Sequence, residues 1–433
     1  MDGLVLGDKK SMPPKNQFRL SKRFYLISIL LLITIITGLA TGFPLFFRLT
    51  YILCVAIILT FVWNLISVKQ LSIKVDRRTE RVHVGDPLVE RITAINDGFI
   101  PKPSLIVEDI ADIPGYSSAH AIDISSKSFR SWRTTTPARK RGIYKIGPIK
   151  VSSSDTLGLY QRDIFQGNTS QITVYPRLHT ISGFDITTDT LYSEGNTTKR
   201  AHILTPHASS IRDYEYGDSI SRVHWKSSAK HGKLMSREFD IGRSNDIWTV
   251  VDLDTSHQYG SLDNGTDEIA VSITASISQK YSSLGRSIGV IGYGNTKLFI
   301  EPSTGQSHFE NILENLAAIR AEGNTPLFDV LAKEDNLWAS QSTLILITSS
   351  TALAWISALE HIRMKHINII VILLNANSYT NEDTELTNAK KLFSLGIKTY
   401  VVDKESSVEA ALSKPYIDAS ATLINKELKE PTA

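Results

Sequence analysis

The sequence contains a single cysteine, Cys54, which lies inside a long apolar run. One cysteine excludes a disulfide framework or a cysteine-based zinc site within one chain. A charge excess of one sign is also lacking, because 47 Lys and Arg residues are balanced by 44 Asp and Glu residues. The charges are interspersed, whereas nucleic-acid binding usually requires a clustered basic face. No nucleic-acid partner is therefore expected.

Low-complexity tracts are absent as well, and hydrophobic residues make up 42% of the chain. A chain of 433 residues is too long for one ordinary hydrophobic core, so two or three structural units are expected. Gly289, Gly292 and Gly294 lack the G-x-G-x-x-G spacing of a dinucleotide site. The sequence identifies no small-molecule substrate.

Two uncharged apolar runs, residues 24–43 and 49–68, lie near the N-terminus. A helix of about 20 residues spans the ~30 Å hydrocarbon core of a bilayer. A secretory signal would have a shorter apolar core followed by a polar mature start, and a buried hairpin of a soluble protein would carry polar residues on one face. The sequence therefore predicts a transmembrane helical hairpin over residues 24–68, with residues 44–48 as its connecting loop.

Basic residues flank this hairpin on both sides. They are Lys9, Lys10, Lys15, Arg19, Lys22 and Arg23 before it, and Lys69, Lys74, Arg77, Arg78 and Arg81 after it. The connecting loop contains only Arg48. Because positive charge stays on the cytoplasmic side, we expect a multi-pass protein of the plasma membrane. The basic segment 1–23 and all soluble domains would be cytoplasmic.

The next region, residues 70–180, alternates apolar and polar residues, as half-buried strands do. Residues 96–98 (Asn-Asp-Gly) favour a turn, because these residue types tolerate positive φ. Short strands at this spacing, without a helical period, indicate a β-sandwich domain.

Residues 245–433 have a different pattern. Strands that are apolar throughout are expected at 247–254, 286–294, 296–302, 343–349, 368–375 and 397–403. Helical patterns lie between them, near 266–282, 307–321 and 326–334. This alternation describes a Rossmann-like α/β domain, with a parallel sheet covered on both faces.

A connector rich in charges of both signs, residues 181–244, joins the two domains. Asp218 or Ser219 is expected to cap a helix that includes Val223 and ends at Gly232. His224 and His231 lie seven apart without a carboxylate at ligand spacing, so no metal site is expected there. Trp225 beside Lys226 would suit nucleic-acid stacking, but the many acidic residues argue against it. A salt-bridged connector that packs the two domains together is the simpler interpretation.

This connector also carries a recognisable motif. Its residues are Gly217, Asp218, Arg222, His224, Trp225, Lys226, Ser228, Ala229, Lys230, Leu234, Arg237 and Glu238. The motif resembles the signature of the bacterial family called domain of unknown function 58, and the segments 84–87, 141–142 and 154–159 resemble that family in the same order. The resemblance implies a C-terminal von Willebrand factor A-like domain, often encoded beside a MoxR-type AAA+ ATPase. The family has no established biochemical activity.

The sharpest candidate site follows the first strand of the α/β domain. Asp252, Asp254 and Ser256 place oxygen-bearing side chains on one side of a loop, which suits a hard cation such as Mg²⁺ or Mn²⁺. The pattern resembles the metal-ion-dependent adhesion site of von Willebrand A domains, whose first loop is Asp-x-Ser-x-Ser. Thr325 stands where that family supplies a second-loop ligand. Two features depart from it: the middle serine is Asp254, and the third loop, residues 348–350, lacks an aspartate. The alternative is that Asp252 caps the neighbouring helix and binds no metal.

Two functions follow from these observations. The first is a non-enzymatic, membrane-anchored interaction or scaffold protein that works with a MoxR-type ATPase in the assembly or maturation of other proteins. The alternative is a metal-dependent hydrolase that uses Asp252 and Asp254, with a general base such as His257 near the metal.

Overall fold

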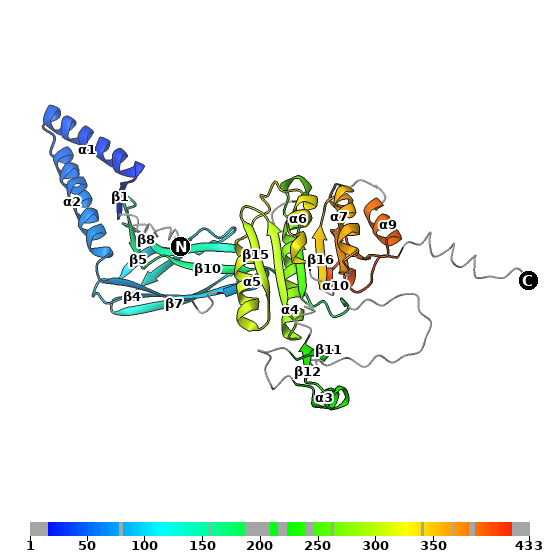
Figure 1. The fold of residues 1–433 in the computed structure, drawn as a ribbon. Coiled ribbons are helices and arrows are strands. Elements are labelled where there is room, and N and C mark those ends of the chain that lie inside the picture. Colours follow the sequence, from blue (N-terminus) through cyan, green and yellow to red (C-terminus); the bar gives the residue numbers. More distant parts are fainter. Residues whose placement is uncertain are drawn as a thin grey trace, which may run out of the picture. The chain divides into compact units, whose positions relative to one another are not determined.

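A computed structural model of the chain describes residues 16–77, 81–155, 157–186, 208–214, 223–239, 246–260, 264–338, 342–365, 367–380 and 386–417. The chain divides into two compact units, residues 1–176 and 177–433. Figure 1 shows both units, and each is described here by itself.

The first unit begins with two long helices, α1 (Lys22–Thr41) and α2 (Pro44–Ser67). Gly42 ends α1 in the left-handed conformation, with φ at 63°, and its N–H donates to the carbonyl of Gly38. Pro44 starts α2, where its missing N–H costs nothing. Residues 44–48 were predicted as a loop, but they form the first turns of α2. That prediction was wrong because an apolar, proline-initiated segment is also a good helix start.

Both helices are long and apolar enough to cross a membrane. Only 11% of the apolar stretch of α1 and 6% of that of α2 is buried, whereas a core helix of a soluble protein would be mostly buried. Large side chains such as Leu39 and Tyr51 are 74% and 68% exposed. The two N-terminal helices therefore form a candidate membrane anchor.

Two β-sheets make up the rest of the first unit. The larger sheet contains β1 (Gln17–Leu20), β3 (Arg81–His83), β5 (Lys102–Ala111), β6 (His120–Ile124), β8 (Gly142–Ser154), β9 (Tyr160–Gln166) and β10 (Ser170–Tyr175). The smaller sheet contains β2 (Leu71–Arg77), β4 (Pro87–Asn96) and β7 (Ser128–Pro137) in the order β2-β4-β7. Ile92 of β4 packs in one core with Val107 of β5 and Val151 of β8, so the two sheets form a sandwich.

Strand β1 precedes the helices, yet it pairs antiparallel with β9, with Phe18 opposite Arg162. These residues were predicted to belong to a separate basic segment, residues 1–23. The ring of Phe18 stacks on Tyr160, which also contacts the rings of Phe24 and Phe61. Contact of these rings with the buried Tyr160 helps to explain why so short a strand forms.

The carboxyl end of α2 is bound to the sandwich by polar contacts. Asn64 donates to the carbonyl of Tyr160 at 3.4 Å, and the hydroxyls of Ser67 and Ser153 lie 3.0 Å apart. Lys102, only 1% exposed, donates to the carbonyls of Ser67 (2.9 Å) and Lys69 (2.5 Å). A cation at the carboxyl end of a helix also interacts favourably with the helix dipole. Burial lowers the pKa of Lys102.

The second unit contains a six-stranded sheet in the order β15-β14-β13-β16-β17-β18. Its strands are β13 (Ile247–Val251), β14 (Ile288–Tyr293), β15 (Lys297–Ser303), β16 (Thr343–Thr348), β17 (Asn368–Leu374) and β18 (Lys398–Val402). All neighbours pair parallel except β15, which pairs antiparallel with β14. The expected parallel sheet is thus mixed at one edge, because only a short turn joins β14 to β15 and a parallel return needs a long crossover.

Helices cover both faces of this sheet (Figure 1). They are α4 (Thr266–Ser283), α5 (Gln306–Ala318), α6 (Leu327–Lys333), α7 (Ala354–Arg363), α8 (Asn377–Thr380), α9 (Thr387–Ser394) and α10 (Val408–Ala411), with 3₁₀ turns at Thr255–His257 and Asp335–Leu337. Helices α6, α7 and α9 share one core with Trp248 and Val250, alternate residues of β13. The apolar strands are therefore buried on both sides, as the sequence predicted.

The second unit also contains a small hairpin module that precedes this sheet in sequence. Strands β11 (Ala208–Asp213) and β12 (Met235–Phe239) pair antiparallel, and helix α3 (Trp225–His231) lies between them in sequence. Gly232 ends α3 in the left-handed conformation, with φ at 68°, which confirms the predicted helix end.

Candidate functional site

The strand order makes the carboxyl ends of β13 and β16 a topological switch point of the sheet. The chain leaves β13 toward β14 on one side and later returns through β16 on the other. Open α/β sheets usually bind their ligands beyond the carboxyl ends of the strands at such a switch point. Asp252 directly follows β13, and Thr348 ends β16.

Asp252 is the most constrained side chain at this edge, and it is 4% exposed. Its Oδ2 accepts a 2.6 Å hydrogen bond from the hydroxyl of Thr348, and its Oδ1 accepts the N–H of Asp254 at 3.2 Å. Burial raises the pKa of the Asp252 carboxyl, although the Thr348 hydroxyl opposes the rise. The charged form is therefore costly unless a cation lies nearby.

Asp254 is a second buried carboxylate, 6% exposed, two residues further on. Its Oδ1 accepts the N–H of Ser256 at 3.1 Å and so caps the 3₁₀ turn Thr255–His257. The capping role foreseen as the alternative for Asp252 belongs to Asp254. Within the described ranges, no hydrogen bond is made by the second oxygen of Asp254.

Gly323 brings the second loop against this turn. It forms a parallel bridge with Asp254, and its carbonyl accepts the N–H of Thr255 at 2.9 Å. A Cβ at position 323 would overlap the carbonyl of Tyr293, so only glycine fits. Thr325 follows two residues later and is half-buried, while Ser256 is exposed. In the part of the chain that the structure describes, neither hydroxyl has a hydrogen-bond partner.

The third loop, residues 348–350, is hydrogen-bonded to the first loop, which follows β13. Ser349 donates to the carbonyl of His257 at 2.5 Å, and the Thr348 hydroxyl also accepts the N–H of Ser350 at 2.9 Å. Gln258 donates to the carbonyls of Asp252 and Asp254, at 3.2 and 3.3 Å. From the sequence, residues 348–350 were notable only because they lack the expected aspartate. In the structure, Thr348 positions the Asp252 carboxylate.

The donor set fits a hard cation only in part. Asp252 and Asp254 supply carboxylates, and Ser256 and Thr325 supply hydroxyls, all of them oxygen atoms that Mg²⁺ or Mn²⁺ accepts. No group of three or more His, Cys, Asp or Glu side chains suited to a metal ion occurs among the described residues. A cation here would need water or a partner's oxygen atoms to complete its shell.

The signature motif lies in the hairpin module. His224 caps α3: its Nδ1 accepts the N–H of Ser227 at 3.2 Å. Ser228 donates to the carbonyl of His224 and accepts the N–H of Met235, which ties the helix to β12. The described helix thus begins at Trp225, and Val223, which was predicted inside the helix, instead bridges Ser236. The prediction for Val223 failed because histidine is not a preferred cap residue. Asp218 and Ser219, the predicted caps, lie outside the described residues.

The other motif residues divide into two groups. Gly217, Asp218 and Arg222 lie outside the described residues, and for Arg237 and Glu238 only the backbone of β12 is described. Among the others, Trp225 and Leu234 are 65% and 47% exposed, and Lys226 and Ala229 belong to α3. Among the described residues of the connector, Lys233 forms an ion pair with Asp213 at 2.6 Å, with both side chains exposed.

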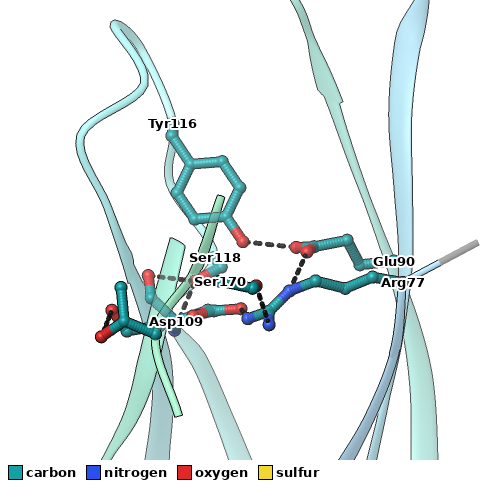
Figure 2. Close-up of polar contacts among 8 residues, drawn as sticks. Arg77, Glu90, Asp109, Tyr116, Ser118 and Ser170 are labelled. Atoms are coloured by element: carbon teal, nitrogen blue, oxygen red, sulfur yellow. Dashed lines mark hydrogen bonds and ion pairs between the residues drawn. The ribbon is translucent and has the colours of Figure 1, made fainter. Parts of the chain in front are cut away.

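A second polar cluster, which the sequence analysis missed, lies inside the sandwich (Figure 2). Arg77 binds Glu90 at 3.0 Å and Asp109 at 2.6 Å, and its Nη1 donates to Ser170 at 2.9 Å. Tyr116 donates to Glu90 at 2.5 Å. Glu90 and Asp109 are 1% and 2% exposed. These partners are separated in sequence by up to 93 residues, so no local pattern reveals them.

Electrostatics in this cluster follow from burial. Burial raises the pKa of Asp109, and the Arg77 guanidinium opposes the rise. Burial alone would lower the pKa of Arg77, but Asp109 and Glu90 raise it overall. Each of these three charges therefore has a partner of opposite sign within the cluster.

Comparison with known proteins locates the family resemblance in the second unit. Residues 210–381 match the family model described as protein of unknown function DUF58. The match begins in β11, and it contains the whole Asp252 site and the whole signature motif. It does not include the sandwich.

Curated relatives carry no stated activity. The chain is 25% identical over 258 residues to the uncharacterized protein YeaD of Bacillus subtilis, covering 57% of this chain and 62% of that protein. It is 23% identical over 215 residues to the uncharacterized protein Rv1480 of Mycobacterium tuberculosis, covering 48% of this chain and 66% of that protein. The chain thus spans less than two thirds of the length of either relative.

Among solved structures, the CARDB domain of PF1109 from Pyrococcus furiosus aligns with 24% of this chain and 94% of that domain, at 15% identity. The alkylpurine DNA glycosylase AlkC of Pseudomonas fluorescens aligns with 24% of this chain and 30% of that protein, at 13% identity. The TM-scores, 0.19 and 0.18, are too low to support any functional argument.

Proposed function

We propose that this chain is a non-enzymatic, membrane-anchored interaction protein. Helices α1 and α2 hold both units at the cytoplasmic surface of the plasma membrane. The carboxyl edge of the second unit, a von Willebrand A-like domain, docks a MoxR-type AAA+ ATPase that takes part in the assembly or maturation of other proteins. The partner class follows from the resemblance of the signature motif to its family.

One observation carries this proposal: two buried carboxylates lie at the strand crossover, and their surroundings leave oxygen atoms available. Asp252 and Asp254 are held by three loops, yet one Asp254 oxygen and the hydroxyls of Ser256 and Thr325 have no partner within the described ranges. Mg²⁺ or Mn²⁺ bound there would expose a coordination position at the surface. A carboxylate of the ATPase would fill that position, so that docking depends on the cation.

The same geometry favours docking over catalysis. The hydroxyls of Thr348 and Ser349 are already engaged, with Asp252 and with the carbonyl of His257. They serve to position the loop and are poorly placed to act as nucleophiles. The signature motif supplies a second contact surface, because its internal hydrogen bonds leave Trp225 and Leu234 exposed. Exposed aromatic residues are frequent anchors in protein interfaces.

The cytoplasmic orientation rests on charge. Arg19, Lys22 and Arg23 precede or begin α1, and Lys69 and Lys74 follow α2, whereas the opposite end of the hairpin carries only Arg48, in the first turns of α2. This distribution fits both flanks on the cytoplasmic side.

Co-purification with the ATPase tests the proposal. The full-length chain is extracted in detergent with Mg²⁺ from cells that contain the ATPase, alongside the variants Asp254→Asn and Asp403→Asn. The first keeps the capping oxygen but removes the charge, and the second makes the same change after β18, at the same edge. We expect the ATPase with wild type and Asp403→Asn, but not with Asp254→Asn. Its absence from the wild-type extract, or equal recovery with all three, would refute the proposal.

A metal-dependent hydrolase is the second candidate, because a raised carboxyl pKa such as that of Asp252 is common at catalytic sites. Its test is turnover of ester and phosphoester substrates with Mn²⁺. A hydrolase loses turnover on Asp252→Ala, whereas a docking protein shows none to lose.

A further inference from the structure

A rigid turn beside the end of α2 exposes an aromatic side chain. Phe99, 77% exposed, lies in the turn between β4 and β5. Exposed apolar side chains on an otherwise ordered surface often mark contacts with a membrane or a partner. The turn carries no catalytic or metal-binding residue.

The turn is fixed by hydrogen bonds, so its exposure does not reflect a loose loop. Asn96 donates to the carbonyls of Ile100 and Ser125, each at 2.9 Å, and accepts the N–H of Gly98 at 3.1 Å. The N–H of Lys127 donates to the carbonyl of Gly98 at 2.9 Å. The Phe99 ring is therefore held outward by its scaffold.

The chain that leaves α2 touches the same turn. The N–H of Asp97 donates to the carbonyl of Gln70 at 3.0 Å, three residues after the end of α2 at Ser67. A helix of 24 residues is about 36 Å long, whereas the hydrocarbon core is ~30 Å thick and the headgroup layers extend several ångströms beyond it. If α2 crosses a bilayer, its carboxyl end and the turn lie at the level of the headgroups.

One lysine contacts the aromatic ring, and a second follows the end of α2. The ammonium of Lys127 lies 4.1 Å from the Phe99 ring centroid, and Lys69 is exposed directly after α2. Lys127 adopts φ of 48°, a conformation unusual outside glycine, and such backbone strain is often found at functional positions. Asp97 is the acidic residue of the turn, and the lysines outnumber it.

We propose that this turn is a second membrane contact: Phe99 inserts at the headgroup level of the bilayer that α2 crosses, and Lys127 and Lys69 bind lipid phosphates. The partner is the phospholipid surface itself. The contact would restrict the tilt of the sandwich relative to the membrane, because the sandwich would be attached at two points, the end of α2 and this turn. This inference rests on the proposed membrane anchor.

Lipid quenching tests the contact in the full-length chain. A fluorescent probe is attached at Asp97→Cys in a Cys54→Ser background, which leaves Phe99 in place. The matched control is Ile143→Cys, an exposed position at the start of β8, roughly 30 Å along that strand from Ser153 beside α2. Vesicles contain phosphatidylcholine and phosphatidylglycerol, with a nitroxide near the headgroup.

We expect quenching and blue-shifted emission at position 97 and neither at position 143. Adding Phe99→Ser should reduce the quenching at position 97. Equal quenching at positions 97 and 143 would overturn the proposal, and so would quenching at position 97 that Phe99→Ser does not reduce. The exposed Phe99 would then be a contact for a protein partner.

A probe on the native Cys54, near the middle of α2, separates the two claims. Quenching of that probe by nitroxides deep in the bilayer, without quenching at position 97, refutes the turn contact while the anchor stands. No quenching at Cys54 would refute the anchor and this inference with it.

Discussion

The interior of the sandwich and the carboxyl edge of the α/β unit each bury two carboxylates, but only those in the sandwich have a cationic partner among the described residues. In the sandwich, Glu90 and Asp109 share the guanidinium of Arg77, and the hydroxyls of Ser170 and Tyr116 add hydrogen bonds to Arg77 and Glu90 (Figure 2). At the carboxyl edge, Asp252 and Asp254 receive hydrogen bonds from N–H and hydroxyl groups but no salt bridge from a described residue.

The difference shows how buried charge can serve structure or function. A buried carboxylate with a cationic partner is satisfied within the fold, and its loss is felt in stability. A buried carboxylate without one lacks a charge of opposite sign within the fold and attracts a proton or a cation. The comparison therefore predicts that substitutions in the sandwich lower stability, whereas substitutions at the edge lower binding.

The largest expected effect is that of Arg77→Met. This change leaves Glu90 and Asp109 buried without a cation, so the first unit should lose about 3–5 kcal/mol of stability. Amide hydrogen exchange of Ile92, in the core of the sandwich, at increasing denaturant concentration would measure the loss. Lys233→Met, which breaks an exposed ion pair, is the control and should change stability by less than ~1 kcal/mol. Similar losses in both variants would contradict the comparison.

A smaller loss is expected for Lys102→Met. The carbonyls of Ser67 and Lys69 lose their donor, which costs about 1–3 kcal/mol when the groups stay buried. Amide hydrogen exchange at the end of α2 should increase, while exchange in β13 stays unchanged. No change at either place would mean that water replaces the ammonium.

Asp254 allows capping and charge to be separated. Asp254→Ala removes the cap of the turn Thr255–His257 and should cost about 1 kcal/mol. Asp254→Asn keeps an accepting oxygen, so its stability should stay near that of the wild type while cation binding is lost. Thermal unfolding of both variants without metal measures the first effect. An equal loss in the two variants would show that the charge itself stabilises the turn.

The smallest effect concerns pH. An unfolded aspartate titrates near pH 3.9, whereas burial raises the pKa of Asp252 in the folded chain. Between these two values the folded state holds a proton that the unfolded state releases, so stability falls as pH rises through this window. Asp252→Asn removes that fall and should raise the melting temperature at neutral pH by a few degrees, about 2–4 °C per kcal/mol gained. A lower melting temperature would mean that the carboxylate charge is satisfied.

Much of the architecture was readable from the sequence. The strands of the α/β unit were predicted because fully buried strands are continuous apolar runs bounded by polar loops. Strand β1 was missed, because four exposed residues have no pattern and form a strand only by pairing with β9. The first loop of the site was predicted from Asp252 and Asp254. The contact of Thr348 with Asp252 was not, since 96 residues separate the two.

The most direct test of the account is a calorimetric titration of the full-length chain with Mn²⁺ and Mg²⁺, beside Asp254→Asn. The account predicts saturable binding to the wild type and none to the variant, with both proteins folded to the same melting temperature before metal is added. The same titration curve for the two proteins would contradict the claim that Asp252 and Asp254 form a binding site.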